Sequence, residues 1–183
     1  LTATISDVSG VPTSGAGLPV LYWKIGAGAY TAATGTFVSG NDYSFSFGSG
    51  VVLNDVVSYY IVAQDLVSTP NIQASPSAGA SGFTANPPAA STAPTTLNSY
   101  SILPALSGTI TVGTGGDYTN LTGLAGAFNK INTSSLSGNL KLAIISDLTE
   151  TGEVALNDYG NDYNIEIRPR GSSVVRKIEG TTI

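Results

Sequence analysis

The chain has 183 residues, a net charge of −5, no cysteine and no histidine, and only 10% of its residues are charged. The missing cysteine excludes disulfides and thiolate metal sites, and the missing histidine removes the commonest general base. There is no basic patch and no apolar run approaching the ~20 residues that cross a bilayer, so we expect neither a nucleic-acid partner nor a membrane span.

Residues 1–76 carry short runs in which apolar and polar side chains alternate. The clearest rows are Leu21, Trp23 and Ile25; Tyr43, Phe45 and Phe47; and Val57, Tyr59, Ile61 and Ala63. Because successive side chains of a strand point to opposite faces, each row predicts one buried face. Trp23 is accordingly expected in the core rather than on a sugar-binding surface. Turns rich in Gly, Pro and Asn separate the runs, and this spacing indicates a β-sandwich.

Residues 77–97 are almost entirely Ala, Ser, Thr, Pro and Gly. This composition permits two interpretations, a stiff linker or an ordered excursion between two strands of the sandwich. The alternating segment 98–103 that follows fits a last strand of the sandwich. We therefore favour a long loop within a first domain of residues 1–104, followed by a second domain of residues 105–183.

The second domain is predicted to begin with a strand at Thr109–Val112 and a tight turn at Gly113–Asp117. This turn lacks the Lys-Ser/Thr pair of a phosphate-binding loop. A helix is predicted over residues 119–132, capped by Asp117 or Thr119, because one apolar face recurs at helical spacing. That face consists of Leu121, Leu124, Ala125, Phe128 and Ile131. The helix would cover the apolar end of the strands predicted behind it, at 140–145, 163–167 and 174–178.

No catalytic residue is predicted in the chain. Glu150 and Glu153 are the one close glutamate pair, and on an extended segment their side chains point to opposite faces and do not converge. Calcium is the only cofactor with candidate ligands, although turn formation and capping explain the same carboxylates. These candidates are Asp158, Asp162, Asp7 and Asp65.

Positive charge is concentrated toward the C-terminal end, at Arg168, Arg170, Arg176 and Lys177. Glu166 and Glu179 are interleaved with these residues, so a solvated face of paired charges is the simpler interpretation. Contact with an acidic glycan is the alternative.

Four segments of the first domain together resemble a known module: Thr4–Asp7, Val11–Gly15, Leu21–Lys24 and Ser58–Asp65. They are similar to the immunoglobulin or fibronectin-III-like modules of large proteins exported by the type IX pathway of gliding bacteria. The stretch Tyr59-Tyr60-Ile61-Val62-Ala63-Gln64-Asp65 is the most specific part of the match. The resemblance implies a spacer or adhesion unit, and it brings no catalytic residue.

The run Gly115-Gly116-Asp117-Tyr118-Thr119, followed by a helix and isolated strands, resembles the capped opening of a right-handed parallel β-helix of the pectinesterase or pectate-lyase type. In those enzymes the acid, base and substrate-binding groups lie on later coils, so no site residue carries over. The expected fold is therefore all-β: an immunoglobulin/fibronectin-III-like sandwich followed by the helix-capped first coils of a parallel β-helix.

Three functions follow from these observations. The favoured one is a fragment of a large secreted protein of the bacterial cell surface, with a structural or adhesive role and no catalysis in this segment. The first alternative is the N-terminal part of a β-helical polysaccharide lyase or carbohydrate esterase whose active site lies downstream, and the second is a glycan-binding module. The expected partners are further coils of the same or another chain at the C-terminal edge, export or surface-assembly machinery and, under the last alternative, glycans.

Overall fold

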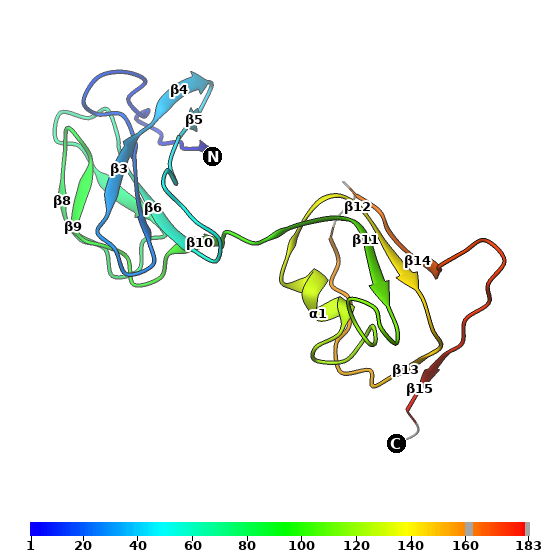
Figure 1. Cartoon of the computed structure of the whole chain (residues 1–183). Coiled ribbons are helices and arrows are strands. Elements are labelled where there is room, and N and C mark those ends of the chain that lie inside the picture. The colour runs from blue at the N-terminus through cyan, green and yellow to red at the C-terminus, as the bar shows by residue number, and fades with distance from the viewer. Residues whose placement is uncertain (160–162, 182–183) are drawn as a thin grey trace. The chain divides into compact units, whose positions relative to one another are not determined.

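The computed structural model describes residues 1–159 and 163–181, which form fifteen strands and one short helix (Figure 1). The all-β prediction is therefore confirmed. The chain divides into two compact units, Leu1–Ile102 and Leu103–Ile183, which we call the N-terminal and the C-terminal unit. Sequence patterning had placed the division two residues later, between residues 104 and 105.

The N-terminal unit contains two antiparallel sheets that share a core. The three-stranded sheet has the order β1-β5-β4, and the five-stranded sheet has the order β10-β6-β2-β3, with β7 also paired to β6. The strands are β1 (Thr2–Thr4), β2 (Val20–Ile25), β3 (Thr31–Thr34), β4 (Thr36–Ser39), β5 (Asp42–Ser44), β6 (Val56–Gln64), β7 (Ile72–Ser75) and β10 (Asn98–Ser101).

The core between these sheets consists of the alternating rows found in the sequence. Leu21 and Trp23 of β2 and Val57 of β6 pack against Tyr43 of β5 and against Phe45, which directly follows that strand. Only 7% of the Trp23 surface is exposed, so its prediction as a core residue is confirmed. Two-residue periodicity thus identified this face correctly, because it depends only on the local strand backbone.

A second core lies on the other face of the five-stranded sheet. Tyr60 and Val62 of β6 are buried there beneath a hairpin formed by β8 (Ser81–Thr84) and β9 (Ala89–Thr92). The Tyr22 hydroxyl donates a hydrogen bond to the Pro88 carbonyl (3.1 Å). The stretch 77–97 is therefore an ordered excursion between β7 and β10 that covers the sheet, rather than a linker.

Parallel pairing distinguishes the C-terminal unit. The strands are β11 (Ala105–Val112), β12 (Ser135–Ile144), β13 (Leu148–Glu150), β14 (Ile165–Pro169) and β15 (Ile178–Gly180). They form one parallel sheet in the order β11-β12-β14 and a second in which β13 pairs with β15 (Figure 1). The prediction of a strand at 174–178 is wrong except for Ile178, which begins β15. Val174 and Val175 are exposed, and their backbone is not in a strand.

The helix predicted over 119–132 exists only in its second half, as α1 (Ala127–Asn132). Its N-cap is Gly126 with no side-chain cap, so the predicted capping by Asp117 or Thr119 is wrong. The carbonyls of Asn120 and Leu121 instead accept hydrogen bonds from the N–H groups of Ala127 and Phe128, residues at the start of the helix. Leu124, assigned to the apolar face, is 68% exposed.

Two glycines explain why the first half is not helical. The Gly123 N–H donates a hydrogen bond to the side-chain oxygen of Asn120 (2.9 Å), and a Cβ added to Gly123 would lie 2.6 Å from that same oxygen. A Cβ on Gly126 would lie 2.6 Å from the Leu121 carbonyl. The chain thus makes a compact loop in which a side chain at Gly126 would clash with the backbone, and glycine has a low helix propensity at both positions. The remaining helix still buries Ala127 and Ile131 in the core of the unit.

Candidate functional site

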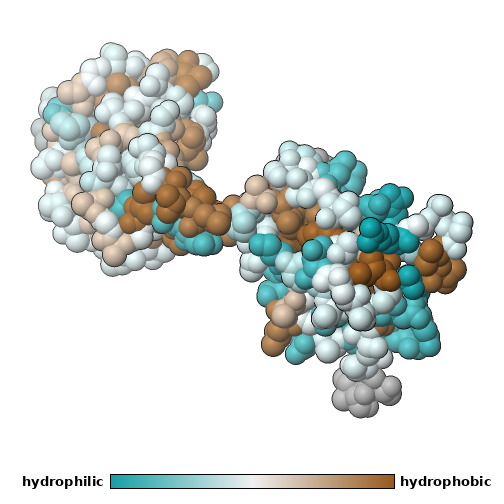
Figure 2. Space-filling view, viewed as in Figure 1, coloured by the Kyte–Doolittle hydropathy of each residue, from teal (hydrophilic) through white to brown (hydrophobic). Residues whose placement is uncertain are grey.

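Strands β14 and β15 form the last edge of the C-terminal unit, and we call them the open edge. Each pairs on one side only within the described residues. Ile167 of β14 is 42% exposed although its register partner Leu142 on β12 is fully buried. Likewise Ile178 of β15 is 49% exposed beside buried Leu148. An apolar row that is buried on one strand is therefore exposed on the next. The surface of the C-terminal unit shows hydrophobic residues among the polar ones (Figure 2).

The polar face of the open edge carries ion pairs. Arg168 contacts Glu166 at 3.3 Å, and Lys177 contacts Glu179, with each side chain more than half exposed. Exposed pairs of this kind contribute about 0–1 kcal/mol each. Their value here is to keep the edge soluble, because charges along an edge strand oppose nonspecific pairing.

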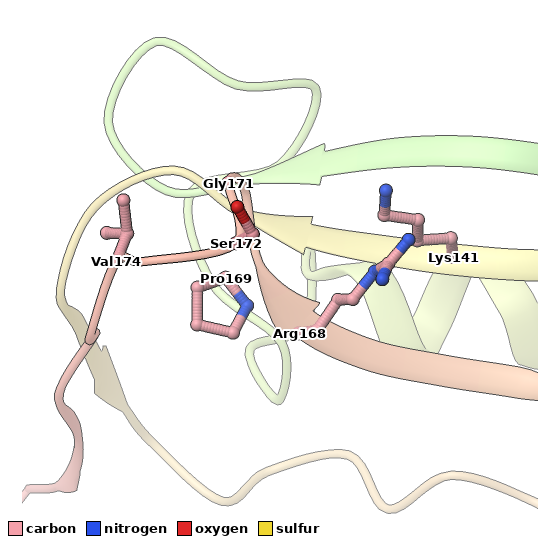
Figure 3. A pocket seen from close by; sticks show the side chains of 6 residues that line it. All are labelled: Lys141, Arg168, Pro169, Gly171, Ser172 and Val174. Atoms are coloured by element: carbon pink, nitrogen blue, oxygen red, sulfur yellow. The ribbon is translucent and has the colours of Figure 1, made fainter.

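A surface hollow of about 560 Å³ lies beside this edge (Figure 3). Lys141 of β12 and Arg168 of the neighbouring β14 line one part of it, and Pro169, Ser172 and Val174 line another. The turn at Gly171 has a φ of 108°, a backbone conformation that favours glycine. Two cations beside a hydroxyl could hold an anion, but Arg168 already has Glu166 as its partner.

The calcium candidates of the N-terminal unit lie close together. Asp7 and Asp65 line one cavity of about 210 Å³. The Asp65 carboxylate accepts hydrogen bonds from the Asn71 side chain (2.6 Å), the Asn71 N–H (3.0 Å) and the Val67 N–H (3.3 Å). The first of these bonds does most to lower the pKa of Asp65. Asp7 accepts a bond from the Ser9 N–H, so both residues stabilise turns.

The other two calcium candidates belong to the C-terminal unit. Asp158 is exposed, and Asp162 lies outside the described residues. Within the ranges 1–159 and 163–181, no three residues of the ligand types His, Cys, Asp and Glu are grouped so as to hold a metal ion.

Glu150 is a buried carboxylate whose role the sequence did not reveal. It is 7% exposed and accepts hydrogen bonds from the Leu121 N–H (2.8 Å), the Thr122 N–H (2.7 Å) and the Thr122 hydroxyl (2.6 Å). It thus holds in place the loop before α1. Its neighbour Glu153 is exposed and accepts a hydrogen bond from the Thr151 hydroxyl (2.7 Å), so the two carboxylates have different surroundings.

Asp117 also has a structural role that sequence reasoning missed. Its carboxylate accepts bonds from the Thr111 N–H (2.8 Å) and the Thr111 hydroxyl (2.7 Å), which ties the Gly-Gly-Asp turn back to β11. The backbone bond from Thr111 is the main cause of a lowered Asp117 pKa. The spacing of six residues was too long for a capping rule to indicate this contact.

Comparison of the chain with protein-family models, curated proteins and solved structures finds no significant match. In the part of the chain that the structure describes, no helix has the length and apolar character needed to cross a membrane.

Proposed function

We propose that the chain is a structural and adhesive segment of a large secreted cell-surface protein. In this proposal the N-terminal unit is an immunoglobulin/fibronectin-III-like spacer, and the C-terminal unit is the opening of a right-handed parallel β-helix. The sequence resemblance to proteins exported by the type IX pathway supports the assignment to a bacterial surface.

The observation that carries the proposal is the repeated parallel pairing in the C-terminal unit. The chain passes from β12 to β13, then from β14 to β15, and each later strand lies parallel to its counterpart in the earlier pair. The Asn139 side chain accepts a bond from the Asn164 N–H, 25 residues further on, and Asp147 accepts one from the Lys177 N–H, 30 residues further on. Such pairing is how a solenoid stacks one coil on the next.

The open edge extends this argument to a partner. Its exposed Ile167 and Ile178 continue rows that are buried one coil earlier, and the free side of each strand can bond to another parallel strand. A further coil, from this chain or from another, would bury these side chains. Surface-assembly or export machinery would be a transient occupant of the same edge.

The alternative of a polysaccharide-acting enzyme has one observation in its favour, the hollow flanked by Lys141 and Arg168. Such an enzyme needs two carboxylates that face a common cleft, and the described residues provide no such pair. The Glu150 carboxylate instead accepts hydrogen bonds from the N–H groups of Leu121 and Thr122. We therefore rank the structural role first.

Surface exposure on the producing cells tests the proposal. An antibody raised against residues 1–102 should label intact cells, and added protease should release peptides of this chain while a cytosolic marker enzyme stays inside. Labelling that requires lysis would overturn the surface role. Depolymerisation of a polysaccharide by the purified chain would overturn the absence of catalysis.

A further inference from the structure

A second surface hollow, of about 600 Å³, lies in the N-terminal unit. It is lined by β3, by the start of β4 and by residues 46–49, and we call it the inter-sheet hollow. Two aromatic rings border it, buried Trp23 and half-buried Phe47. Its volume lies within the range of about 300–1,000 Å³ typical of pockets that hold small ligands.

The hollow exists because an edge strand carries small side chains where the core needs large ones. On β3 the residues paired with Trp23 and Leu21 are Thr31 and Ala33. The chain then changes sheets at Gly35, where an added Cβ would lie 2.8 Å from the Phe45 ring. The small side chains of Thr31 and Ala33 thus leave space at this edge that larger side chains would fill.

The lining has a distinctive chemistry. None of its residues is charged, and the lining includes five residues that carry a hydroxyl group: Thr31, Thr34, Thr36, Ser46 and Ser49. The structure gives these five hydroxyls no hydrogen-bond partner in the described parts of the chain, although each can donate one bond and accept two. Ser44 is the exception, with a long 3.5 Å bond to the Thr36 carbonyl.

Phe47 also connects the hollow to further aromatic surface. Its ring centroid lies 5.1 Å from that of Tyr59 and 6.1 Å from that of Tyr100, which is 39% exposed. A neighbouring hollow of about 500 Å³ is lined by these three rings together with Leu1, Phe45 and Ser46. Phe47 thus borders two adjacent hollows, an arrangement that suits a ligand longer than one ring.

We propose that the inter-sheet hollow binds a neutral oligosaccharide. A sugar presents an apolar C–H face that packs on an aromatic ring and hydroxyls that exchange hydrogen bonds with serine and threonine. The absence of charge in the lining excludes a strong preference for acidic sugars. An extended peptide is the competing ligand, but β3 has only four residues before the change of sheet and is a poor template for strand addition.

Sugar binding would identify the ligand of the proposed adhesive role. It rests on the proposed function only in this respect, because the binding itself can be measured without knowing where the protein is located. Its test is independent of the surface-labelling experiment: a chain that binds sugars but is not exposed on cells would refute the surface role alone. A chain that is exposed but binds no sugar would refute the inference alone.

Trp23 makes the test direct, because it is the only tryptophan in the chain and borders the hollow. The whole chain is titrated with maltotriose, cellotriose, mannotriose and chitotriose, and with trigalacturonic acid as the acidic comparison, while Trp23 emission and the heat of binding are recorded. We expect at least one neutral trisaccharide to change the emission saturably and to bind more tightly than the acidic one. Binding of none, or of the acidic sugar preferentially, overturns the proposal.

Four variants then locate the site. Ser49→Arg should weaken binding at least about ten-fold, because the new side chain fills the hollow. Phe47→Leu should also weaken binding, because it removes the ring while keeping an apolar side chain. Thr31→Val should lower the affinity about five-fold, because one hydrogen bond is lost. Thr92→Val, on the outer hairpin, is the matched control and should bind normally. Equal affinity in all four variants, or binding of extended peptides in place of sugars, overturns the assignment.

Discussion

The two units differ in how completely their apolar side chains are covered. In the N-terminal unit the five-stranded sheet is covered on both faces, by the second sheet on one side and by the Pro-rich hairpin on the other. In the C-terminal unit α1 and its preceding loop pack on the buried core, but Ile167 and Ile178 of the open edge remain exposed. Antiparallel hairpins return the chain to complete a closed unit, whereas parallel coils leave an edge that another coil can extend.

The largest effect should come from comparing two inward positions that are register partners, Leu142 and Ile167. Leu142→Ala removes a fully buried side chain and should lower the free energy of unfolding by about 3 kcal/mol. Ile167→Ala should cost less than about 1 kcal/mol, because that side chain is already half in water. Urea unfolding followed by far-UV circular dichroism measures both.

Trp23 emission separates the units in this experiment, because the only tryptophan lies in the N-terminal unit. We expect the emission transition to stay in place for both variants. Equal losses for Leu142→Ala and Ile167→Ala would mean that the open edge is covered in solution, and the contrast between the units would no longer hold.

A smaller effect is expected at the loop before α1. Glu150→Ala leaves the N–H groups of Leu121 and Thr122 without their charged acceptor, and should cost about 2 kcal/mol in the C-terminal unit. Glu153→Ala, three residues away and exposed, should cost less than about 0.5 kcal/mol. The same unfolding measurement checks this pair, and similar losses would show that Glu150 does not anchor the loop.

The smallest expected effect is a loss of stability at low pH, which should involve Asp65 in the N-terminal unit and Asp117 in the C-terminal unit. The pKa values of Asp65 and Asp117 are lowered below the ordinary value of 3.8, so the unfolded chain binds these protons first as the pH falls. Their stabilisation is therefore present above about pH 4 and is lost as the pH falls through the folded-state pKa.

Asparagine variants assign that loss to each unit. Asp117→Asn should reduce the drop in thermal midpoint between pH 5 and pH 3 for the transition seen by circular dichroism. Asp65→Asn should reduce it for the transition seen by Trp23 emission. An unchanged acid profile in either variant would contradict the role assigned to that carboxylate.

The sequence predicted those features that depend on local geometry. The rows containing Trp23 and Tyr43 could be identified because strand alternation repeats every two residues. The helix prediction failed over residues 119–126, since its apolar spacing was real but Gly123 and Gly126 favoured a loop held by Glu150, 29 residues from Leu121. Such distant contacts leave no periodic signal.

The candidate sites show the same division. The sequence predicts a partner at the C-terminal edge and a last strand at 174–178. Among the described residues the edge strands there are β14 and β15, and of the predicted strand only Ile178 belongs to β15. The hollow beside Lys141 and the inter-sheet hollow could not be predicted. The first depends on the turn at Gly171, and the second on the small side chains of β3 lying opposite residues 46–49. Both require knowledge of which segments meet in space.

The anchoring of the loop by Glu150 has a consequence for the order of folding. Its contacts with Leu121 and Thr122 join residues 29 and 28 positions apart, so closing them carries the entropic cost of a long loop. We expect the six-residue α1, too short to persist alone, to form only when β13 brings this carboxylate into place. On a chain emerging from its N-terminal end, α1 would thus form late, only after β13 has been made.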